Sequence, residues 1–221
     1  MQALPALPDR GDEFRYASAP LCVLDAVFSI GVRYESVEAL IRRYADHYGL
    51  PLHRADAALP SERDQATVSD LVGQIEALGA ERFAVEVVEN RCRTSSRGGI
   101  LKAEAALEFA RVLAAHGIET LQDLATRLED DALIRDLRAV HGQGSGIAVK
   151  YFLMLAGADQ LAKPDRMIMR SLERVLGRRV GVDEAQDLLT EAARAVGPPA
   201  SVGAVDYAIW QHERQRRVTV R

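Results

Sequence analysis

The stretch that decides the fold is Val140-His141-Gly142-Gln143-Gly144-Ser145-Gly146, which holds three closely spaced glycines. Amphipathic segments flank it at about 132–139 and 145–156, with apolar residues at helical spacing. A tight glycine turn between two helices exposes backbone N–H groups at the start of the second helix. Those donors and the positive end of the helix dipole would bind one phosphate without reading a base. The pattern is typical of a helix–hairpin–helix, and a plain helix–turn–helix corner is the alternative.

A dinucleotide-binding loop is another interpretation of the same glycines, because their spacing resembles a truncated fingerprint. That fingerprint requires a β-strand directly before the loop. The segment at 131–140 instead carries its charges and apolar residues at helical spacing. We therefore set the dinucleotide interpretation aside.

Helical periodicity continues through nearly the whole chain. Apolar residues recur at three- and four-residue intervals in five further stretches, one of which contains Val37, Leu40, Ile41 and Tyr44. Glycine and proline residues separate these stretches. Only 85–88 is an ambiguous apolar run, and its charged flanks favour a helix. The sequence predicts an all-α protein of about ten helices, each ~8–17 residues long.

Size and composition limit the possible classes of protein. The chain has 221 residues, enough for one large or two small domains, and its 28 Lys and Arg against 32 Asp and Glu give a net charge of −4. A nucleic-acid site must therefore be a local positive patch. Cys22 and Cys92, both expected to be buried, are too few for an iron–sulfur cluster. No histidine spacing indicates a metal site. No apolar run reaches ~18 residues, the length of a membrane span, so we expect a cytoplasmic protein.

Positive charge gathers on both sides of the glycine stretch. Residues 90–102 hold four cations and no acid, whereas 163–179 hold six cations and two acids. Solvated helix faces are the usual explanation for one such cluster. Several clusters around a candidate phosphate-binding turn favour nucleic acid instead. After the second amphipathic helix, Pro164 and Asp165 suit the start of another helix, where an acid stabilises the helix or serves chemistry.

This order of hairpin, amphipathic helix and helix-opening Asp resembles the helix–hairpin–helix DNA glycosylases of the endonuclease III-like superfamily. Residues 21–37 and 90–104 resemble other segments of that family, so the likeness covers about 21–177. It implies a two-lobed, all-α bundle with a cleft between lobes. Residues 1–20 would form an arm packing on the second lobe, 21–155 the lobe with the hairpin at 140–146, and 156–221 the lobe carrying Asp165.

The resemblance also implies roles for individual residues. Asp165 would stabilise the cationic sugar and activate water, and Gly142, Gln143, Gly144, Ser145 and Gly146 would hold a phosphate of double-stranded DNA. Further DNA contacts would come from Arg91, Arg93, Arg97, Lys102, His141, Lys163, Arg166 and Arg170. Ser29, Arg33 and Tyr34 would supply the wedge or pocket, because Gly31 stands at the usual wedge position. The expected protein is a nucleoid-associated monomer without a small-molecule cofactor, with room for a monovalent cation at the hairpin.

One departure from the family bears on the reaction. Members that also cleave the strand carry a lysine where this chain has Gly146. Lys150 lies four residues later on the same helix face and is the alternative nucleophile. The expected activity is therefore monofunctional base excision by water. The alternatives are a non-catalytic DNA-binding protein and a helical protein-interaction module, which the net negative charge favours.

Overall fold

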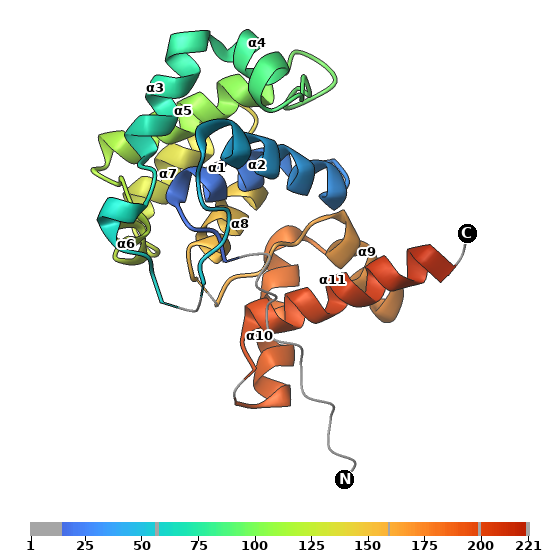
Figure 1. Ribbon diagram of the computed structural model, residues 1–221. Helices are drawn as coiled ribbons and strands as arrows, with labels where there is room; N and C mark the ends of the chain where they lie inside the picture. The colour runs from blue at the N-terminus through green and yellow to red at the C-terminus, as the bar shows by residue number, and fades with distance from the viewer. Residues whose placement is uncertain (1–14, 56–57, 159, 199, 220–221) are drawn as a thin grey trace. The chain divides into compact units, whose positions relative to one another are not determined.

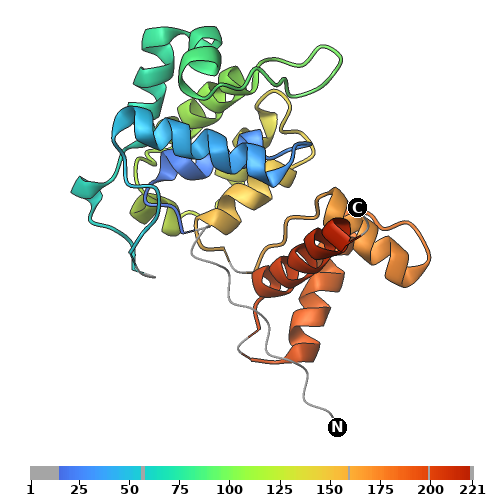
Figure 2. The ribbon, with the colours of Figure 1, turned by 45° about the vertical axis from the view of Figure 1, so that its right-hand side comes forward.

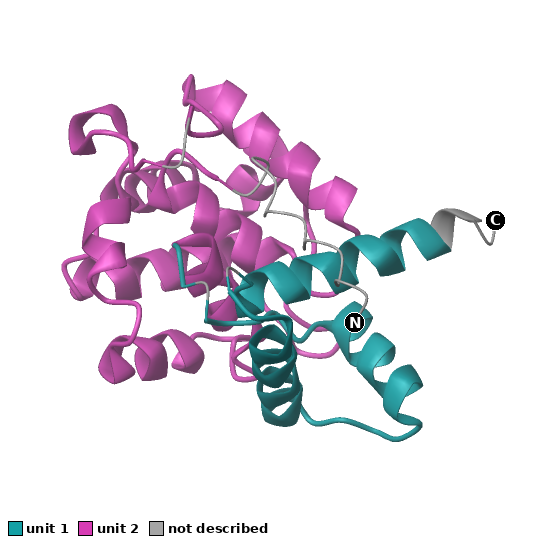
Figure 3. Cartoon of the chain, turned by 90° about the horizontal axis from the view of Figure 1, so that it is seen from below, with its two compact units in different colours: residues 1–11, 157–221 teal, residues 12–156 magenta. Residues whose placement is uncertain are grey.

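The structure is a computed structural model that describes residues 15–55, 58–158, 160–198 and 200–219 (Figure 1). These residues form helices and two isolated β-bridges but no strand, so the predicted all-α class is confirmed. The chain divides into two compact units, residues 12–156 and residues 157–221 with 1–11, coloured separately in Figure 3.

The larger unit, residues 12–156, is built around α1 (Ala19–Phe28), whose ten residues are all buried. Pro20 near its start fits the fixed φ of a first turn. α1 packs against α2, α5 and α8, and α3 packs against α5. The remaining helices of this unit are α2 (Tyr34–Tyr48), a 3₁₀ turn (Glu62–Asp64), α3 (Val68–Leu78), α4 (Ala80–Arg82), the π-helical turn Phe83–Val87, α5 (Lys102–Ala115), α6 (Leu121–Ala125), α7 (Asp131–Ala139) and α8 (Ile147–Leu155).

Side-chain caps explain where several of these helices begin. Thr67 accepts a hydrogen bond from the Asp70 N–H at 3.0 Å, and the Asp70 carboxylate accepts one from the Thr67 N–H at 2.7 Å. Asp130 accepts two bonds at the start of α7. Such caps satisfy N–H groups that have no partner inside the helix. These caps fix the residues at which α3 and α7 begin.

The smaller unit contains α9 (Arg166–Leu176), α10 (Val182–Val196) and α11 (Val202–Thr219). Its core is a small apolar cluster that includes Ile168, Leu189 and Val205. Glu213 is only 8% exposed and accepts hydrogen bonds from Ser171 and the Arg174 guanidinium. This pairing joins α11 to α9 beside the apolar core.

The structure bears on three further expectations. Residues 1–14 of the predicted arm lie outside the described residues, while 15–20 belong to the larger unit, where Tyr16 is buried and bridges to His53. Most of the ambiguous apolar run lies in the π-helical turn Phe83–Val87, so the helix expected there is confirmed. Cys22 is buried and burial raises its pKa to about 12, but Cys92 is exposed because it lies in a surface loop.

Candidate nucleic-acid interface

The hairpin, defined here as residues 140–146, is a compact turn that begins at the end of α7 and leads into α8. The Gln143 N–H donates to the Val140 carbonyl at 2.9 Å, and the Gly146 N–H donates to the Gln143 carbonyl at 2.8 Å. Gly142 and Gly146 have φ of 85° and 72°, a conformation that strains other residues. Gly144 and Ser145 are exposed at the turn. The expected cation at the hairpin stays a prediction.

Residues 91–101 form a loop, here called the finger, that doubles back on itself directly before α5. The Thr94 N–H donates to the Ile100 carbonyl at 2.9 Å, and the Lys102 N–H donates to the Cys92 carbonyl at 2.9 Å. The Arg93 guanidinium spans the two arms by donating to the Gly99 carbonyl at 2.8 Å. These bonds order the finger and leave its cations Arg91, Arg93 and Arg97 exposed.

The finger lies beside the hairpin, as Figure 2 shows for the green and yellow loops, and the two meet at Thr94 and Gly142. A Cβ added to Gly142 would lie 2.4 Å from the Thr94 Cβ and 2.7 Å from its Cγ2. Two segments almost fifty residues apart in sequence therefore touch through one glycine and one threonine. The structure thus brings the first predicted positive cluster to the predicted phosphate site.

Lys102 was expected to contact DNA, and that expectation is wrong. The residue is 3% exposed, and its ammonium group donates to the carbonyls of Phe28 at 2.9 Å and Ile30 at 2.6 Å. These carbonyls lie at and just beyond the end of α1, where the last carbonyls have no partner within the helix and the dipole favours a cation. Lys102 is therefore a helix cap inside the larger unit.

The predicted wedge residues lie in and beside the turn between α1 and α2. Ser29 is half-buried and donates to the Ala26 carbonyl at 3.1 Å. Arg33 is exposed just before α2, and Tyr34 is the first, half-buried residue of that helix. Because Lys102 binds carbonyls of this same turn, the turn is held next to the base of the finger. Arg33 is the exposed side chain here that could reach a ligand.

Two charged side chains near the hairpin escaped the sequence analysis. Arg138 is exposed in the last turn of α7, and its Nε lies 3.3 Å from where a Cβ on Gly146 would be. Its guanidinium therefore lies beside the residue that precedes α8. The second side chain is an acid: Glu108 accepts a hydrogen bond from the His141 N–H at 3.4 Å. The sequence could have indicated Arg138, because it lies in the predicted helix 132–139 only three residues before His141.

Two buried oxygens, one on the hairpin and one on the finger, have no hydrogen-bonding partner among the described residues. They are Oε1 of Gln143, whose side chain is 3% exposed overall, and Oγ1 of Thr94. An unsatisfied buried polar atom costs about 1–3 kcal/mol. The Oε1 atom of Gln143 therefore lowers stability at this position, whereas its backbone shapes the turn.

Asp165 lies in the smaller unit and precedes α9, as expected for a residue that opens a helix. Its Oδ1 accepts hydrogen bonds from the N–H groups of Met167 at 2.7 Å and Ile168 at 3.1 Å. Arg166 and Arg170 are exposed on α9, and Lys163 is half-buried. These positions form one local group of an acid and three cations. Lys150, the alternative nucleophile, is half-buried on α8 of the larger unit.

A buried acid on α1 was also missed. Asp25 is 0% exposed, and its Oδ2 accepts hydrogen bonds from the hydroxyls of Tyr16 and Tyr151, both at 2.9 Å. Burial and the nearby Asp25 carboxylate raise the pKa of Tyr16, so this hydroxyl stays protonated and able to donate. The network joins α1 to α8. A lone acid within the apolar stretch 21–28 was the signal that could have revealed it.

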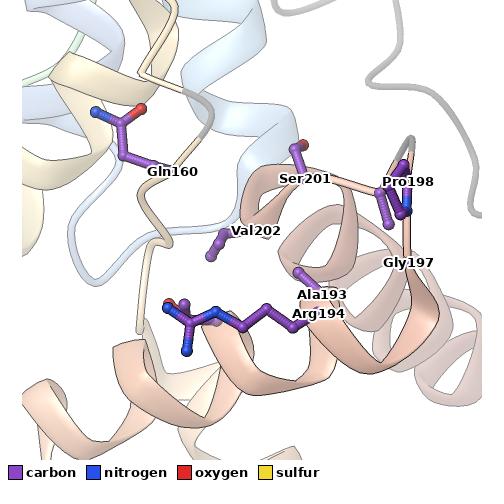
Figure 4. Close-up of a pocket in the computed structure, with 9 residues that line it drawn as sticks. Gln160, Ala193, Arg194, Gly197, Pro198, Ser201 and Val202 are labelled. Carbon is purple, nitrogen blue, oxygen red and sulfur yellow. The ribbon is translucent and has the colours of Figure 1, made fainter.

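The smaller unit also has a shallow pocket of about 500 Å³ between the end of α10 and the start of α11 (Figure 4). Its lining is largely apolar, and Arg194 is the single titratable residue among the described residues around it. One cation without an acid beside it supplies no acid–base pair, although the hydroxyls of Thr190 and Ser201 line the pocket. The pocket therefore has no evident catalytic role.

The described residues thus define an all-helical protein of two compact units, with a glycine hairpin and a cation-bearing finger together on the larger unit. The chain belongs to the family described as "Domain of unknown function (DUF8548)", whose model matches residues 2–214. No curated protein and no solved structure matches the chain. Within the described ranges, no helix has the length and apolarity to cross a membrane, and no group of three or more His, Cys, Asp or Glu could hold a metal.

Proposed function

We propose that this protein is a DNA glycosylase that binds duplex DNA and hydrolyses the bond between a damaged or mismatched base and its sugar. The observation that carries the proposal is the order of hairpin, α8 and an Asp that caps the next helix. That order resembles the helix–hairpin–helix glycosylases, and the two-lobed arrangement with a cleft belongs to the same proposal. Exposed arginines beside the hairpin support the choice of DNA as partner.

Binding begins with the sugar-phosphate backbone. The exposed turn at Gly144 and Ser145 offers main-chain donors to one phosphate, and such contacts fix the register of a protein on DNA. The protein carries a net charge of −4, so a duplex must be attracted by the local cations of the finger and of α9. The DNA-bound protein would act as a monomer associated with the nucleoid.

Asp165 then serves the chemical step. Its Oδ1 is fixed by two N–H groups, whereas no donor among the described residues reaches its Oδ2. The free oxygen would stabilise the positive charge that develops on the sugar and accept a proton from water. The water oxygen bonds to C1′, the glycosidic bond breaks, and the base leaves with a proton, which yields an abasic site. Gly146 carries no amine, so water rather than lysine is the nucleophile.

The test replaces Asp165 by Asn, which still caps a helix but accepts no proton. Duplexes with uracil, oxidised or alkylated bases are scored for abasic product, and we expect Asp165→Asn to lose about 10²–10⁴-fold in rate with unchanged duplex affinity. Asp130→Asn is the matched control, because Asp130 also caps a helix through two N–H groups at 3.0 and 3.1 Å. It should retain the parent rate.

Other outcomes identify the competing functions. Base release by Asp165→Asn at the parent rate would remove this residue from the mechanism. Trapping of a covalent adduct by borohydride would implicate a lysine imine, with Lys150 as its source. Duplex binding without base release from any lesion would indicate a non-catalytic DNA-binding protein. Lack of duplex affinity even at low salt would indicate a protein-interaction module.

A further inference from the structure

We infer that the finger and the hairpin form one clamp on the DNA backbone, with Thr94 as the residue that sets their spacing. This inference rests on the proposed function, because the clamp's ligand is a DNA strand. The hairpin would hold one phosphate, and the finger would place its exposed arginines on neighbouring phosphates of that strand. Thr94 is a positioning residue in this scheme and does not itself contact DNA.

The contact between the two elements is tight enough to fix their spacing. Any Cβ at position 142 would lie within 2.9 Å of three side-chain atoms of Thr94. Real Cβ contacts are longer than this, so the Thr94 side chain occupies the space that only a glycine leaves open. On the finger side, the Thr94 N–H is bonded to the Ile100 carbonyl. A shift of Thr94 must therefore move the segment of the finger that carries it.

The base of the finger is anchored independently. The chain leaves the finger at Lys102, whose buried ammonium group binds the carbonyls of Phe28 and Ile30, while its N–H binds Cys92. Lys102 holds the base of the finger and Thr94 its middle, and at the exposed tip the Ser95 hydroxyl donates to the Arg97 carbonyl at 2.7 Å. A cation held in place loses less conformational entropy when it binds a phosphate than a freely moving one does.

The charges of this surface fit an anion. Arg91 and Arg97 of the finger and Arg138 beside Gly146 are exposed and form no ion pair among the described residues. Glu108 lies near them, since it accepts a hydrogen bond from the His141 N–H. Three cations without an ion pair, beside a turn of main-chain donors, favour a polyanion over a protein surface. Each phosphate contact should add about −0.9 to the slope of log affinity against log salt.

The experiment measures duplex affinity as a function of salt for Gly142→Ala, Arg97→Ala and the double variant. Each single variant should bind about 3–10-fold more weakly and lose about one phosphate contact from the salt slope. In the double variant the loss should not exceed that of Gly142→Ala alone, because the displaced finger no longer presents Arg97. Adding Thr94→Gly to Gly142→Ala removes the clash and should recover part of the affinity.

Two further measurements separate the clamp from simpler effects. Gly117→Ala is the matched control for backbone strain, because Gly117 has φ of 71° and a Cβ there would meet nothing within 4 Å. It should leave duplex affinity unchanged. Hydrogen exchange at the Thr94 amide needs no DNA, and it should quicken at least tenfold in Gly142→Ala.

The results that overturn the inference differ from those that overturn the proposed function. Fully additive losses for Gly142→Ala and Arg97→Ala, or unchanged exchange at Thr94, would show that the finger is not positioned by this contact, even if the protein excises bases. A parent protein that binds no duplex while Thr94 exchange quickens as expected would refute the DNA function and leave the mechanical link intact.

Discussion

Replacement of Lys102 by Met tests the burial of this cation most directly. Methionine keeps most of the apolar stem but cannot donate to the Phe28 and Ile30 carbonyls, which now accept bonds of 2.9 and 2.6 Å. A hydrogen bond from a charged donor contributes about 1.5–3 kcal/mol, and removal of the donor leaves a buried carbonyl unsatisfied. The variant also avoids the desolvation of a buried ammonium group, which offsets part of the loss.

We therefore expect Lys102→Met to lower the free energy of unfolding by about 2–4 kcal/mol. For a protein of this size, that change corresponds to a fall in Tm of roughly 5–15 °C, measured by circular dichroism. Arg97→Met is the contrasting variant, because it removes an exposed cation of the neighbouring finger. It should leave Tm within about 1 °C of the parent.

Duplex affinity completes this comparison. At temperatures where both variants are folded, Arg97→Met should bind DNA more weakly than Lys102→Met. If Lys102→Met unfolds at the parent temperature and yet loses most of its duplex affinity, the ammonium group reaches DNA and its assignment as a helix cap is refuted.

Two other predictions concern single polar side chains. Gln143→Met should raise the free energy of unfolding by about 1 kcal/mol in urea titrations, because it removes a buried acceptor that has no donor. The contrasting variant is Gln65→Met, which breaks the hydrogen bond from the Leu121 N–H at 3.1 Å and should lower the free energy of unfolding. A loss of stability in Gln143→Met would reveal a partner for that side chain. Burial by itself would raise the pKa of Glu213. The hydrogen bonds from Arg174 and Ser171 outweigh burial, so the pKa lies below its ordinary value. A lowered pKa in the folded state gives stability that is complete above about pH 4.3 and is lost as pH falls through the folded value. On acidification, Glu213→Gln should therefore lose about 1 kcal/mol less of its free energy of unfolding than the parent does. Identical profiles of unfolding free energy against pH for parent and variant would contradict this.

Helix positions could be predicted because each depends on residues close in sequence. The apolar stripe of Val37, Leu40, Ile41 and Tyr44 is buried in α2, and the helix expected at 145–156 is found at Ile147–Leu155. Periodicity is a local property, so no partner segment needs to be known to read it. The start of α9 after Asp165 follows from the local chemistry of helix caps in the same way.

The environments of single side chains could not be predicted in this way. Lys102 closes a run of four cations, and a count of neighbouring charges assigns all four to the surface. Its acceptors lie 72 and 74 residues earlier, so its burial depends on the packing of α5 against α1. The role of Asp25 likewise depends on Tyr151, which is 126 residues away. Such pairings are properties of the tertiary fold, which charge runs and apolar periodicity do not encode.

Gly142 shows how the two levels combine. The sequence places this glycine in a candidate phosphate-binding turn, and the structure adds a φ of 85° and the contact with Thr94. Loss of DNA binding in a Gly142 variant therefore does not isolate phosphate approach as its cause. Gly144 separates the causes, because its φ is not positive and a Cβ there would meet nothing within 4 Å. A side chain at 144 leaves the turn and the finger in place, so only a ligand would encounter it.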